Sequence, residues 1–335
     1  MRFLPKVVFG VLGCSRVAQK GMLPAICDSN FAELGIVGSR SREKAQLVAG
    51  QFDCDSFGTY EDVLGDKRIN AVYISLPNAL HEEWAIKAAA SGKHVLCEKP
   101  AAISYSAAQR MAEAARKHSV RLLEGLMFRY HPQHDWVRTL IREGFLGDLL
   151  RFEGCFGYPV PDRSSTMMNQ QFGGGSLYAC APYPVYASRM FLGGEPLSVT
   201  CSLKVDADTG VDFQADMLLQ YPEGRSAFIS SAFGSYFQST YSLLGSEAFV
   251  RAARAYAVPR DMKTKIFFDT DDTINEIIIE PADHFRLMVD DFCQEILKGE
   301  RSEKDYEGDL LSQSRVLEAA KVSAAEERIV LISEI

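Results

Sequence analysis

Short apolar runs alternate with amphipathic stretches along the first 125 residues of the chain. Apolar runs bounded by turn residues predict strands, and apolar positions spaced three and four residues apart predict helices between them. The predicted strands are 6–12, 31–38, 71–75, 94–97 and 121–124, and the predicted helices are 17–28, 42–51, 82–91 and 105–118. Strands that alternate with helices in this way are typical of a parallel, doubly wound α/β sheet.

The pattern changes after residue 125. A helix is predicted over 132–143, and longer segments follow in which apolar and polar residues alternate, as in an antiparallel sheet with one exposed face. These segments are 149–158, 197–206, 211–221, 225–233 and 236–244, and a final amphipathic helix is predicted over 305–327. We therefore expect two domains, a doubly wound domain over 1–125 and an α+β domain over 126–335. A chain of 335 residues can build a hydrophobic core in each.

The composition narrows the possible function classes. The chain is 47% hydrophobic and 24% charged, with a net charge of −8, so it lacks the basic character of a nucleic-acid-binding protein. No apolar run approaches the ~20 residues that span a bilayer. The eight cysteines are scattered without a C-x-x-C pair, which favours free thiols in a reducing cytoplasm over disulfides or a metal site. The apolar N-terminal stretch lacks a small-residue cleavage site, so we expect no signal peptide.

The first predicted strand runs into a glycine loop. Residues 13–18 fit the pattern G-x-G-x-x-A, with Ser15 in place of the second glycine. Such a loop turns tightly at the first glycine, lets the backbone approach a pyrophosphate, and points the amides of the next helix at the phosphate charge. Its place between a strand and a helix favours a dinucleotide site over an ordinary strand–helix turn. We therefore expect Gly13, Cys14, Ser15 and Arg16 to bind the cofactor.

The end of the second strand indicates which dinucleotide is bound. A site for NAD usually carries an acidic residue here, which accepts a hydrogen bond from the ribose 2′-hydroxyl. This chain has Ser39 and Arg40 instead, and a hydroxyl beside a guanidinium suits a 2′-phosphate. We expect NADP(H), with NAD(H) as the second choice, and Ser41 as an assisting ligand. The alternative is that Arg40 and Arg42 are solvated charges at the start of a helix.

Two further strands end in candidate site residues. The third strand leads into Ser75, Leu76 and Asn78, which we expect at the cofactor crevice, and His81 either contacts the cofactor or caps the following helix. The fourth strand stops abruptly in Glu98-Lys99-Pro100, at the edge where open α/β sheets bind ligands. Glu98 either pairs with Lys99 or faces the cofactor ribose. Lys99 either orients a substrate oxygen or is an ordinary surface lysine, and a cis peptide before Pro100 would aim it into the crevice.

The second domain carries a candidate proton donor. Three glycines at 173–175 open a helical segment in which Tyr183 follows about two turns later. A tyrosine hydroxyl can donate a proton to a developing alkoxide when a nearby cation lowers its pKa, and the alternative is a packed aromatic residue. The loop 156–172 is expected to line the substrate cleft. Its candidate substrate contacts are Tyr158, Arg163 and Asn169, although Arg163 is equally explained as a solvated loop residue.

These segments together resemble the glucose–fructose oxidoreductase / inositol dehydrogenase (Gfo/Idh/MocA) family of NAD(P)-dependent dehydrogenases. The resemblance is carried by GVLGCSRVA at 10–18, CEKP at 97–100, EGLMFRYHPQ at 124–133 and GGGSLYACAPYPV at 173–185. It implies a Rossmann domain and a second domain with a large, open, mostly antiparallel sheet, through which members commonly form dimers or tetramers. It also implies that Lys99 is the active-site lysine, that Tyr183 occupies the position of a catalytic histidine or tyrosine, and that Arg129 and His131 lie near the cofactor and the cleft.

Tyrosine at 183 is similar to the branch with dihydrodiol and xylose dehydrogenases and sugar-nucleotide ketoreductases. Ala179 departs from the family pattern, which usually has an aspartate four residues before the catalytic residue, and this disfavours an inositol-type substrate. The expected function is hydride transfer between NADP(H) and a carbonyl or carbinol carbon of a sugar, sugar nucleotide or related cyclic alcohol. Lys99 and Tyr183 would act at the reacting oxygen. The alternatives are a catalytically silent NADP-binding sensor and an isomerase or glycosidase that oxidises its substrate transiently.

Overall fold

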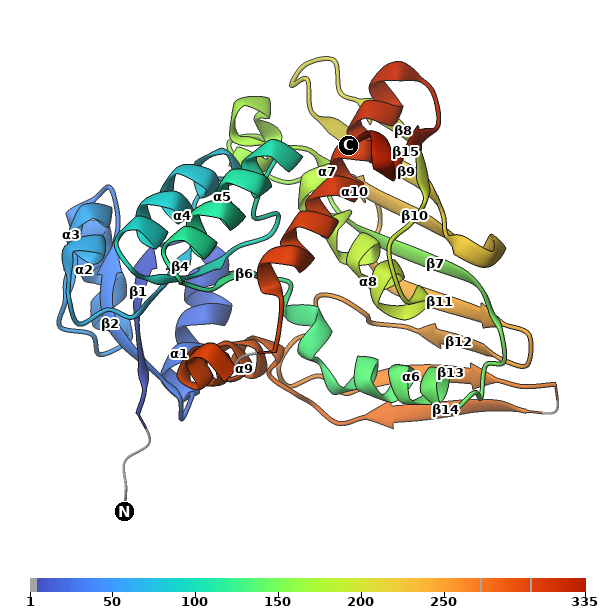
Figure 1. Cartoon of the computed structure of the whole chain (residues 1–335), viewed down its shortest axis with the longest axis horizontal. Coiled ribbons are helices and arrows are strands. Elements are labelled where there is room, and N and C mark those ends of the chain that lie inside the picture. Colours follow the sequence, from blue (N-terminus) through green and yellow to red (C-terminus); the bar gives the residue numbers. More distant parts are fainter. Residues whose placement is uncertain (1–4, 272, 302) are drawn as a thin grey trace. The chain divides into compact units, whose positions relative to one another are not determined.

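A computed structural model of the chain describes residues 5–271, 273–301 and 303–335 (Figure 1). The chain forms two compact units. Unit 1 comprises Met1–Met127 and Phe285–Leu311, and unit 2 comprises Phe128–His284 and Ser312–Ile335. The structure therefore divides the chain differently from the expected 1–125 and 126–335, because a late segment returns to unit 1. In that segment the ring of Phe292 lies 6.5 Å from that of Phe9, and a Cβ at Gly21 would lie 2.8 Å from the ring of Phe285.

Unit 1 is built on a six-stranded sheet in the order β3-β2-β1-β4-β5-β6, and every neighbouring pair is parallel. The strands are β1 (Val7–Leu12), β2 (Ala32–Gly38), β3 (Phe57–Gly58), β4 (Ala71–Ile74), β5 (His94–Cys97) and β6 (Leu122–Glu124). All residues of β4 are buried, as in a strand that is covered on both faces. The strand order reverses between β1 and β4, where sheets of this kind bind their ligands. The predicted doubly wound sheet is confirmed.

The helices that belong wholly or mostly to unit 1 include the four that were predicted and others that were not. The unit 1 helices are η1 (Ala18–Met22), α1 (Leu23–Asp28), α2 (Arg42–Gln51), α3 (Tyr60–Gly65), η2 (Asn78–Leu80), α4 (His81–Ala90), α5 (Tyr105–Lys117), α9 (His284–Lys298) and η7 (Gly299–Arg301). Of these, α3 and α9 were not predicted. Side-chain oxygens of Ser41, Thr59 and Ser104 cap the N-termini of α2, α3 and α5. The predicted helix 17–28 begins with the π-helical turn η1, because Pro24 has no N–H with which to continue an α-helical ladder.

Unit 2 contains a nine-stranded sheet in the order β14-β13-β12-β11-β7-β10-β9-β8-β15. The strands are β7 (Leu149–Tyr158), β8 (Ser198–Val205), β9 (Asp212–Gln220), β10 (Ser226–Phe233), β11 (Gln238–Gly245), β12 (Phe249–Ala252), β13 (Thr264–Asp269), β14 (Ile274–Ile279) and β15 (Val330–Leu331). Only the β7–β10 pair is parallel within the described residues, so the expected large, mostly antiparallel sheet is confirmed. The sequence pattern missed β12 and β15, which are too short to show a periodicity, and it also missed the six-residue strands β13 and β14.

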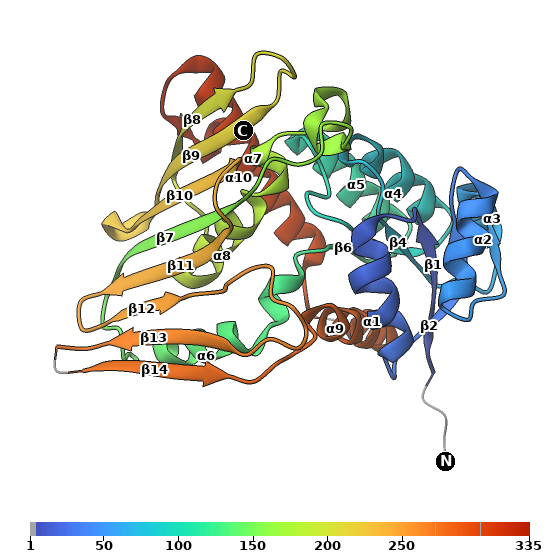
Figure 2. The same ribbon diagram turned by 180° about the vertical axis from the view of Figure 1, so that it is seen from behind.

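The longer helices of unit 2 lie on one face of this sheet, and short helical turns occur in its loops. The unit 2 helices are η3 (Met127–Tyr130), which begins at the last residue of unit 1, α6 (Pro132–Arg142), η4 (Thr166–Met168), η5 (Gln170–Phe172), α7 (Ser176–Ala179), α8 (Pro182–Leu192), η6 (Pro222–Gly224), α10 (Tyr306–Glu326), whose first turn belongs to unit 1, and η8 (Ile332–Glu334). In Figure 2 the strands of the sheet face the viewer, and α6 and α8 lie behind them. The helical segment expected from Gly173 is two helices, because Pro182 and Pro184 lack the N–H groups that would extend α7.

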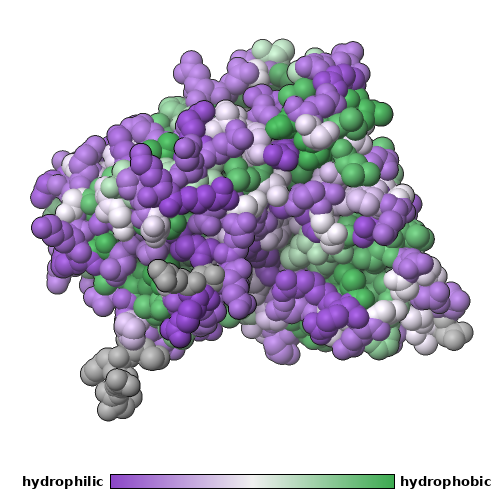
Figure 3. Space-filling model, viewed as in Figure 1, coloured by the Kyte–Doolittle hydropathy of each residue, from purple (hydrophilic) through white to green (hydrophobic). Residues whose placement is uncertain are grey.

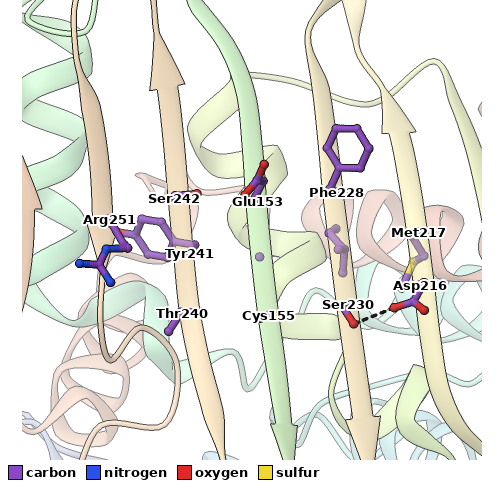
Figure 4. A pocket seen from close by; sticks show the side chains of 12 residues that line it. Glu153, Cys155, Asp216, Met217, Phe228, Ser230, Thr240, Tyr241, Ser242 and Arg251 are labelled. Atoms are coloured by element: carbon purple, nitrogen blue, oxygen red, sulfur yellow. Dashed lines mark hydrogen bonds between the residues drawn. The ribbon is translucent and has the colours of Figure 1, made fainter. Parts of the chain in front are cut away.

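Alternate residues of β7 face opposite sides of the sheet. Phe156 faces α8, and a Cβ at Gly154 would lie 2.8 Å from Pro184 of that helix. Glu153 and Cys155 face the other side, where they line a recess of about 510 Å³ with residues of β9 to β12 (Figure 4). This uncovered face, which we call the open face, carries Asp216 and Ser230, joined by a hydrogen bond of 2.6 Å.

The surface is mixed in character. Hydrophilic residues cover most of unit 1 in the view of Figure 3, and hydrophobic residues gather in several places on unit 2. No described helix combines the length and the apolar composition needed to cross a membrane. All eight cysteines are free thiols.

Candidate active site

The glycine loop connects β1 to η1, and its shape depends on Gly13. This residue has a φ of +105°, and a Cβ there would lie 2.8 Å from the carbonyl oxygen of Ser75, so other residues do not fit. Its N–H donates to the carbonyl oxygen of Gly38 at 3.0 Å, which ties the loop to the end of β2. Ser75 Oγ donates to Ser15 Oγ at 2.6 Å, and Ser15 Oγ accepts from the N–H of Ala18 at 3.1 Å. The structure thus brings Gly13, Ser15 and Ser75 together.

The end of β2 offers a buried hydroxyl and an exposed guanidinium. Ser39 is buried and Arg40 is exposed. Burial raises the pKa of the Cys14 thiol, whereas the charge of Lys44 and a hydrogen bond with Ser39 lower it. Because of this hydrogen bond, Cys14 lies beside Ser39. Ser41 Oγ accepts from the Lys44 N–H at 3.2 Å and so caps α2.

Arg40 lies beside a phenol. Burial raises the pKa of Tyr60, and the charge and hydrogen bonds of Arg40 lower it. Arg16, by contrast, is an exposed residue of the glycine loop. A glycine that no side chain can replace, a buried serine and an exposed arginine fit a dinucleotide with a 2′-phosphate. The donor set therefore suits NADP(H).

The loops after β4 and β5 are joined through His81. This side chain is fully buried, and its ring nitrogens lie 2.9 Å from the carbonyl oxygens of Leu76 and Pro100. Burial lowers the pKa of His81, and the two carbonyl groups oppose this effect. With both nitrogens engaged, His81 holds the two loops together, in place of the cofactor contact or helix cap considered from the sequence. Leu76 is close to Gly13, since a Cβ there would lie 3.0 Å from Leu76 Cδ2, and the half-buried Asn78 begins η2.

Glu98 and Lys99 directly follow the end of β5, and the peptide bond between Lys99 and Pro100 is cis. Glu98 Oε1 accepts from the Tyr73 hydroxyl at 2.7 Å, and Oε2 accepts from the Lys99 N–H at 3.3 Å. Burial raises the pKa of Glu98, whereas the Tyr73 hydrogen bond and the Lys99 charge lower it. The Lys99 side chain is half-buried. Sequence reasoning missed Tyr73 because a tyrosine within a buried strand looks like any other core aromatic.

Tyr183 is the second residue of α8, and aromatic rings surround it. Its ring centroid lies 5.0 Å from Phe156 and 5.7 Å from Phe128, both edge-on, and 5.8 Å from the stacked ring of Tyr256. Only 5% of Tyr183 is exposed. Three rings that contact one ring leave it little rotational freedom, so the phenol is held in place. Sequence reasoning missed Tyr256, because no local pattern marks it.

Tyr158 lies near Tyr183. Burial raises the pKa of Tyr158, as do the neighbouring Cys180 and Tyr183, and its hydroxyl contacts the Met167 sulfur at 3.4 Å. The other two predicted substrate contacts are exposed and already have partners within the chain. Arg163 lies 3.7 Å from Asp208, and Asn169 Oδ1 accepts from the Gln171 N–H at 2.9 Å.

The turn formed by the three glycines at 173–175 lies against Asp212, the first residue of β9. Asp212 Oδ2 accepts from Ser176 Oγ at 2.7 Å and from the Leu177 N–H at 2.6 Å, and a Cβ at Gly175 would collide with Asp212. At this turn the backbone therefore approaches a carboxylate of β9 closely. Sequence reasoning missed this role of Asp212.

The family resemblance also implied that Arg129 and His131 lie near the cofactor and the cleft. Arg129 donates to the hydroxyls of Tyr186, on α8, and Tyr130. His131 is fully buried, and its Nδ1 accepts from the Gln133 N–H at 3.3 Å, so it caps α6. The recess on the open face lies on the opposite side of the sheet from Tyr183 and is lined by none of these candidates.

A doubly wound sheet with a phosphate-binding glycine loop, a lysine after β5, and a second unit with a packed tyrosine define a dinucleotide-dependent oxidoreductase. Residues 7–126 match the model of an oxidoreductase family with an NAD-binding Rossmann fold, and residues 134–251 match the GFO/IDH/MocA C-terminal domain. The chain belongs to the Gfo/Idh/MocA family and is an NAD(P)-dependent oxidoreductase.

Relatives match this chain along nearly its whole length. The dTDP-3,4-didehydro-2,6-dideoxy-alpha-D-glucose 3-reductase of Saccharopolyspora spinosa is 34% identical, over 95% of this chain and 96% of its own. D-xylose 1-dehydrogenase (NADP(+)) 2 of Haloferax volcanii is 30% identical, over 95% and 97%. A 3-ketoreductase from Actinomadura kijaniata in complex with NADP and TDP-benzene has a TM-score of 0.91 at 27% identity, and the match covers 95% of this chain and 98% of that one. That ketoreductase has also been crystallised with a lysine replaced by alanine or glutamate, and with a tyrosine replaced by phenylalanine.

Proposed function

We propose that the protein transfers a hydride between NADP(H) and a carbonyl or carbinol carbon of a sugar, sugar nucleotide or related cyclic alcohol. The observation that carries the proposal is that unit 1 presents Lys99 at the charged end of β5 and unit 2 presents the packed Tyr183 at the start of α8. The lysine and tyrosine varied in the A. kijaniata ketoreductase are separated by as many residues as Lys99 and Tyr183 are here. The relatives that reduce a nucleotide-linked ketosugar or oxidise xylose support the substrate class.

Residues of unit 1 would hold the cofactor, which supplies or accepts the hydride when bound. The backbone at Gly13 and the linked hydroxyls of Ser15 and Ser75 face the pyrophosphate in this assignment. Ser39 and Arg40 bind the 2′-phosphate, and Glu98 faces the nicotinamide ribose. The remaining proposed contacts are Cys14, Arg16, Leu76, Asn78, Lys99 and Arg129, with His81 holding the loops in place.

Tyr183 and Lys99 act on the substrate oxygen. In the reducing direction the carbonyl carbon gains the hydride, and the oxygen takes a proton from the Tyr183 hydroxyl. Lys99 hydrogen-bonds the same oxygen and stabilises the negative charge that develops on it. In the oxidising direction the same groups remove the proton. Tyr158, Arg163 and Asn169 are the proposed substrate contacts.

The test replaces each acting group and measures turnover. Lys99→Ala and Tyr183→Phe should each lower kcat by roughly 10²–10⁴-fold, the contribution typical of general acid–base catalysis. Lys87→Ala is the matched control, because Lys87 is an exposed lysine paired with Glu83 on α4. NADPH affinity, followed by nicotinamide fluorescence, should change little in Tyr183→Phe. An unchanged kcat in Lys99→Ala would refute the proposed role of Lys99 at the substrate oxygen.

Ala179 favours one second candidate, a catalytically silent NADP-binding sensor. This buried alanine places no carboxylate four residues before Tyr183, where the family pattern has one. The sensor requires tight NADPH binding with no turnover across a broad panel of sugars and nucleotide sugars. Turnover of any member of the panel by the wild type, lost in Lys99→Ala, would exclude it.

We also propose that the open face of the unit 2 sheet pairs with a second copy of the chain, as the family resemblance implies. Phe228 is 46% exposed in the middle of this face and lines its recess. A charge placed there would oppose burial of the face. Phe228→Glu should therefore reduce the mass measured by light scattering from that of a dimer or tetramer to that of one chain, whereas a wild-type monomer would contradict the proposal.

A further inference from the structure

One end of the unit 2 sheet gathers the loops around Tyr183. The ends of β7 and β10 meet there, since Tyr158 pairs with Phe233, and β11 starts there, since Gln238 pairs with Gly157. The ring of Phe156 contacts both Tyr183, at 5.0 Å, and Phe237 of the β10–β11 loop, at 6.3 Å. The β10–β11 loop is thus one aromatic side chain away from the proposed proton donor.

An arginine of the β12–β13 loop lies against this loop, and within the described residues it forms no ion pair with an acidic side chain. The guanidinium carbon of Arg254 lies 4.1 Å from the centroid of the Phe237 ring, and its Nε donates to the Ala257 carbonyl oxygen at 3.2 Å. Burial lowers the pKa of Arg254, and the one charge that raises it is that of Tyr236. No carboxylate of the described residues lies within ion-pair distance of this guanidinium. An arginine remains charged in proteins, and a partly desolvated charge is stabilised by an anion.

Beside Arg254 stands the most exposed of the large apolar side chains in the described chain. Tyr236 is 88% exposed at the tip of the β10–β11 loop. An exposed aromatic ring is a surface on which a planar ring can stack, and arginine suits phosphate because its planar donors match the phosphate oxygens. The two side chains together fit a ligand that carries a planar ring and a phosphate close to each other.

We propose that Arg254 and Tyr236 form a subsite for the nucleoside diphosphate part of a nucleotide-linked sugar. Arg254 pairs with a phosphate oxygen, and Tyr236 stacks on the base. The sugar extends past Phe237 and Phe156 toward Tyr183. This inference rests on the proposed function, because Tyr183 marks the reacting end of the substrate.

The chain offers a matched control for this arginine. The guanidinium carbon of Arg251 lies 4.5 Å from the centroid of the Phe267 ring, so it also lies over a phenylalanine, but it lines the recess of the open face. Arg251 and Arg254 therefore share chemistry and differ in location. Arg163 is less suitable as a control, because it already lies near Asp208 and belongs to the predicted substrate loop.

The experiment measures binding of thymidine 5′-diphosphate to the protein saturated with NADP, so that the cofactor site is filled. Calorimetry compares the wild type with Arg254→Gln, Tyr236→Ala and Arg251→Gln, after thermal melts and NADP titrations show that each variant is folded. Arg254→Gln should weaken binding of the diphosphate about 10–100-fold, the effect of one lost charge-assisted hydrogen bond. Tyr236→Ala should weaken binding of the diphosphate and leave binding of inorganic pyrophosphate unchanged. Arg251→Gln should bind like the wild type.

Two results would overturn the subsite. One is equal affinity of Arg254→Gln and Arg251→Gln for the diphosphate, and the other is a wild type that does not bind it. Turnover by Lys99→Ala separates this inference from the proposed function. If Lys99→Ala retains full activity while Arg254→Gln no longer binds thymidine 5′-diphosphate, the catalytic role of Lys99 is refuted and the subsite stands.

Discussion

The hydrogen bond from Tyr73 to Glu98 leads to a quantitative prediction. Tyr73 is fully buried in β4, and its hydroxyl donates to Glu98 Oε1 at 2.7 Å. Tyr73→Phe removes this one oxygen and keeps the ring. The phenol also hydrogen-bonds with Ser75, whose hydroxyl donates to Ser15, so Tyr73 connects the glycine loop with the corner that carries Lys99.

The magnitude follows from the charge on the acceptor. A hydrogen bond to a charged group contributes about 1.5–3 kcal/mol, and one pKa unit corresponds to about 1.4 kcal/mol. Burial already raises the pKa of Glu98, and the Tyr73 bond opposes that effect. Without the bond, the pKa of Glu98 should rise further, because the ionised carboxylate loses this stabilisation. If ionised Glu98 faces the ribose, NADPH affinity should be lost at a correspondingly higher pH as the solution is acidified.

The assay titrates NADPH by nicotinamide fluorescence between about pH 5 and 9. Tyr241→Phe is the matched control, because Tyr241 is buried in unit 2 and its hydroxyl contacts His134 Nδ1 at 3.1 Å. Both variants lose a buried hydrogen bond, so both should be less stable than the wild type. Only Tyr73→Phe should shift the pH profile. Profiles of Tyr73→Phe and wild type that superimpose would refute the reasoning.

Three further predictions concern cofactor choice, the glycine turn and acid stability. Arg40→Ala should lower NADPH affinity by roughly tenfold and leave NADH affinity unchanged, measured by fluorescence titration; equal wild-type affinities for the two cofactors would contradict the role of Arg40. Asp212→Ala should lower the free energy of unfolding in urea by about 1–3 kcal/mol, because it leaves the Ser176 hydroxyl and Leu177 N–H without their acceptor; an unchanged midpoint would show that the turn forms without it. Burial lowers the pKa of His131 to about 4 and of His284 to about 3. As the pH falls below about 6.5, these histidines are therefore protonated in the unfolded chain before they are protonated in the folded one. The free energy of unfolding should then decrease by up to about 1.4 kcal/mol per pH unit for each histidine. His131→Asn, which can still cap α6, should flatten that dependence in urea titrations.

Much of the fold could be predicted because its signals are local. The apolar runs of β1, β4 and β5 are continuous, as expected for strands buried on both faces, and β5 has the predicted bounds. The alternation along β7 likewise predicted a sheet with one open face. The short strands β12 and β15 gave no periodicity and were missed, and the longer strands β13 and β14 were missed as well.

The sequence by itself determined the family, the glycine loop, the charged end of β5 and the tyrosine at the start of α8, because each is a contiguous stretch whose chemistry is visible in its own residues. Only the tertiary structure decided what those residues contact. Tyr73 and Glu98 are 25 residues apart, and Ser176 and Asp212 are 36 residues apart. Contacts of this kind depend on strand order and helix packing, since side chains distant in sequence meet only after the sheets have formed. For the same reason Arg254 looks like an ordinary loop residue until the sheet carries it to the end where Tyr183 lies.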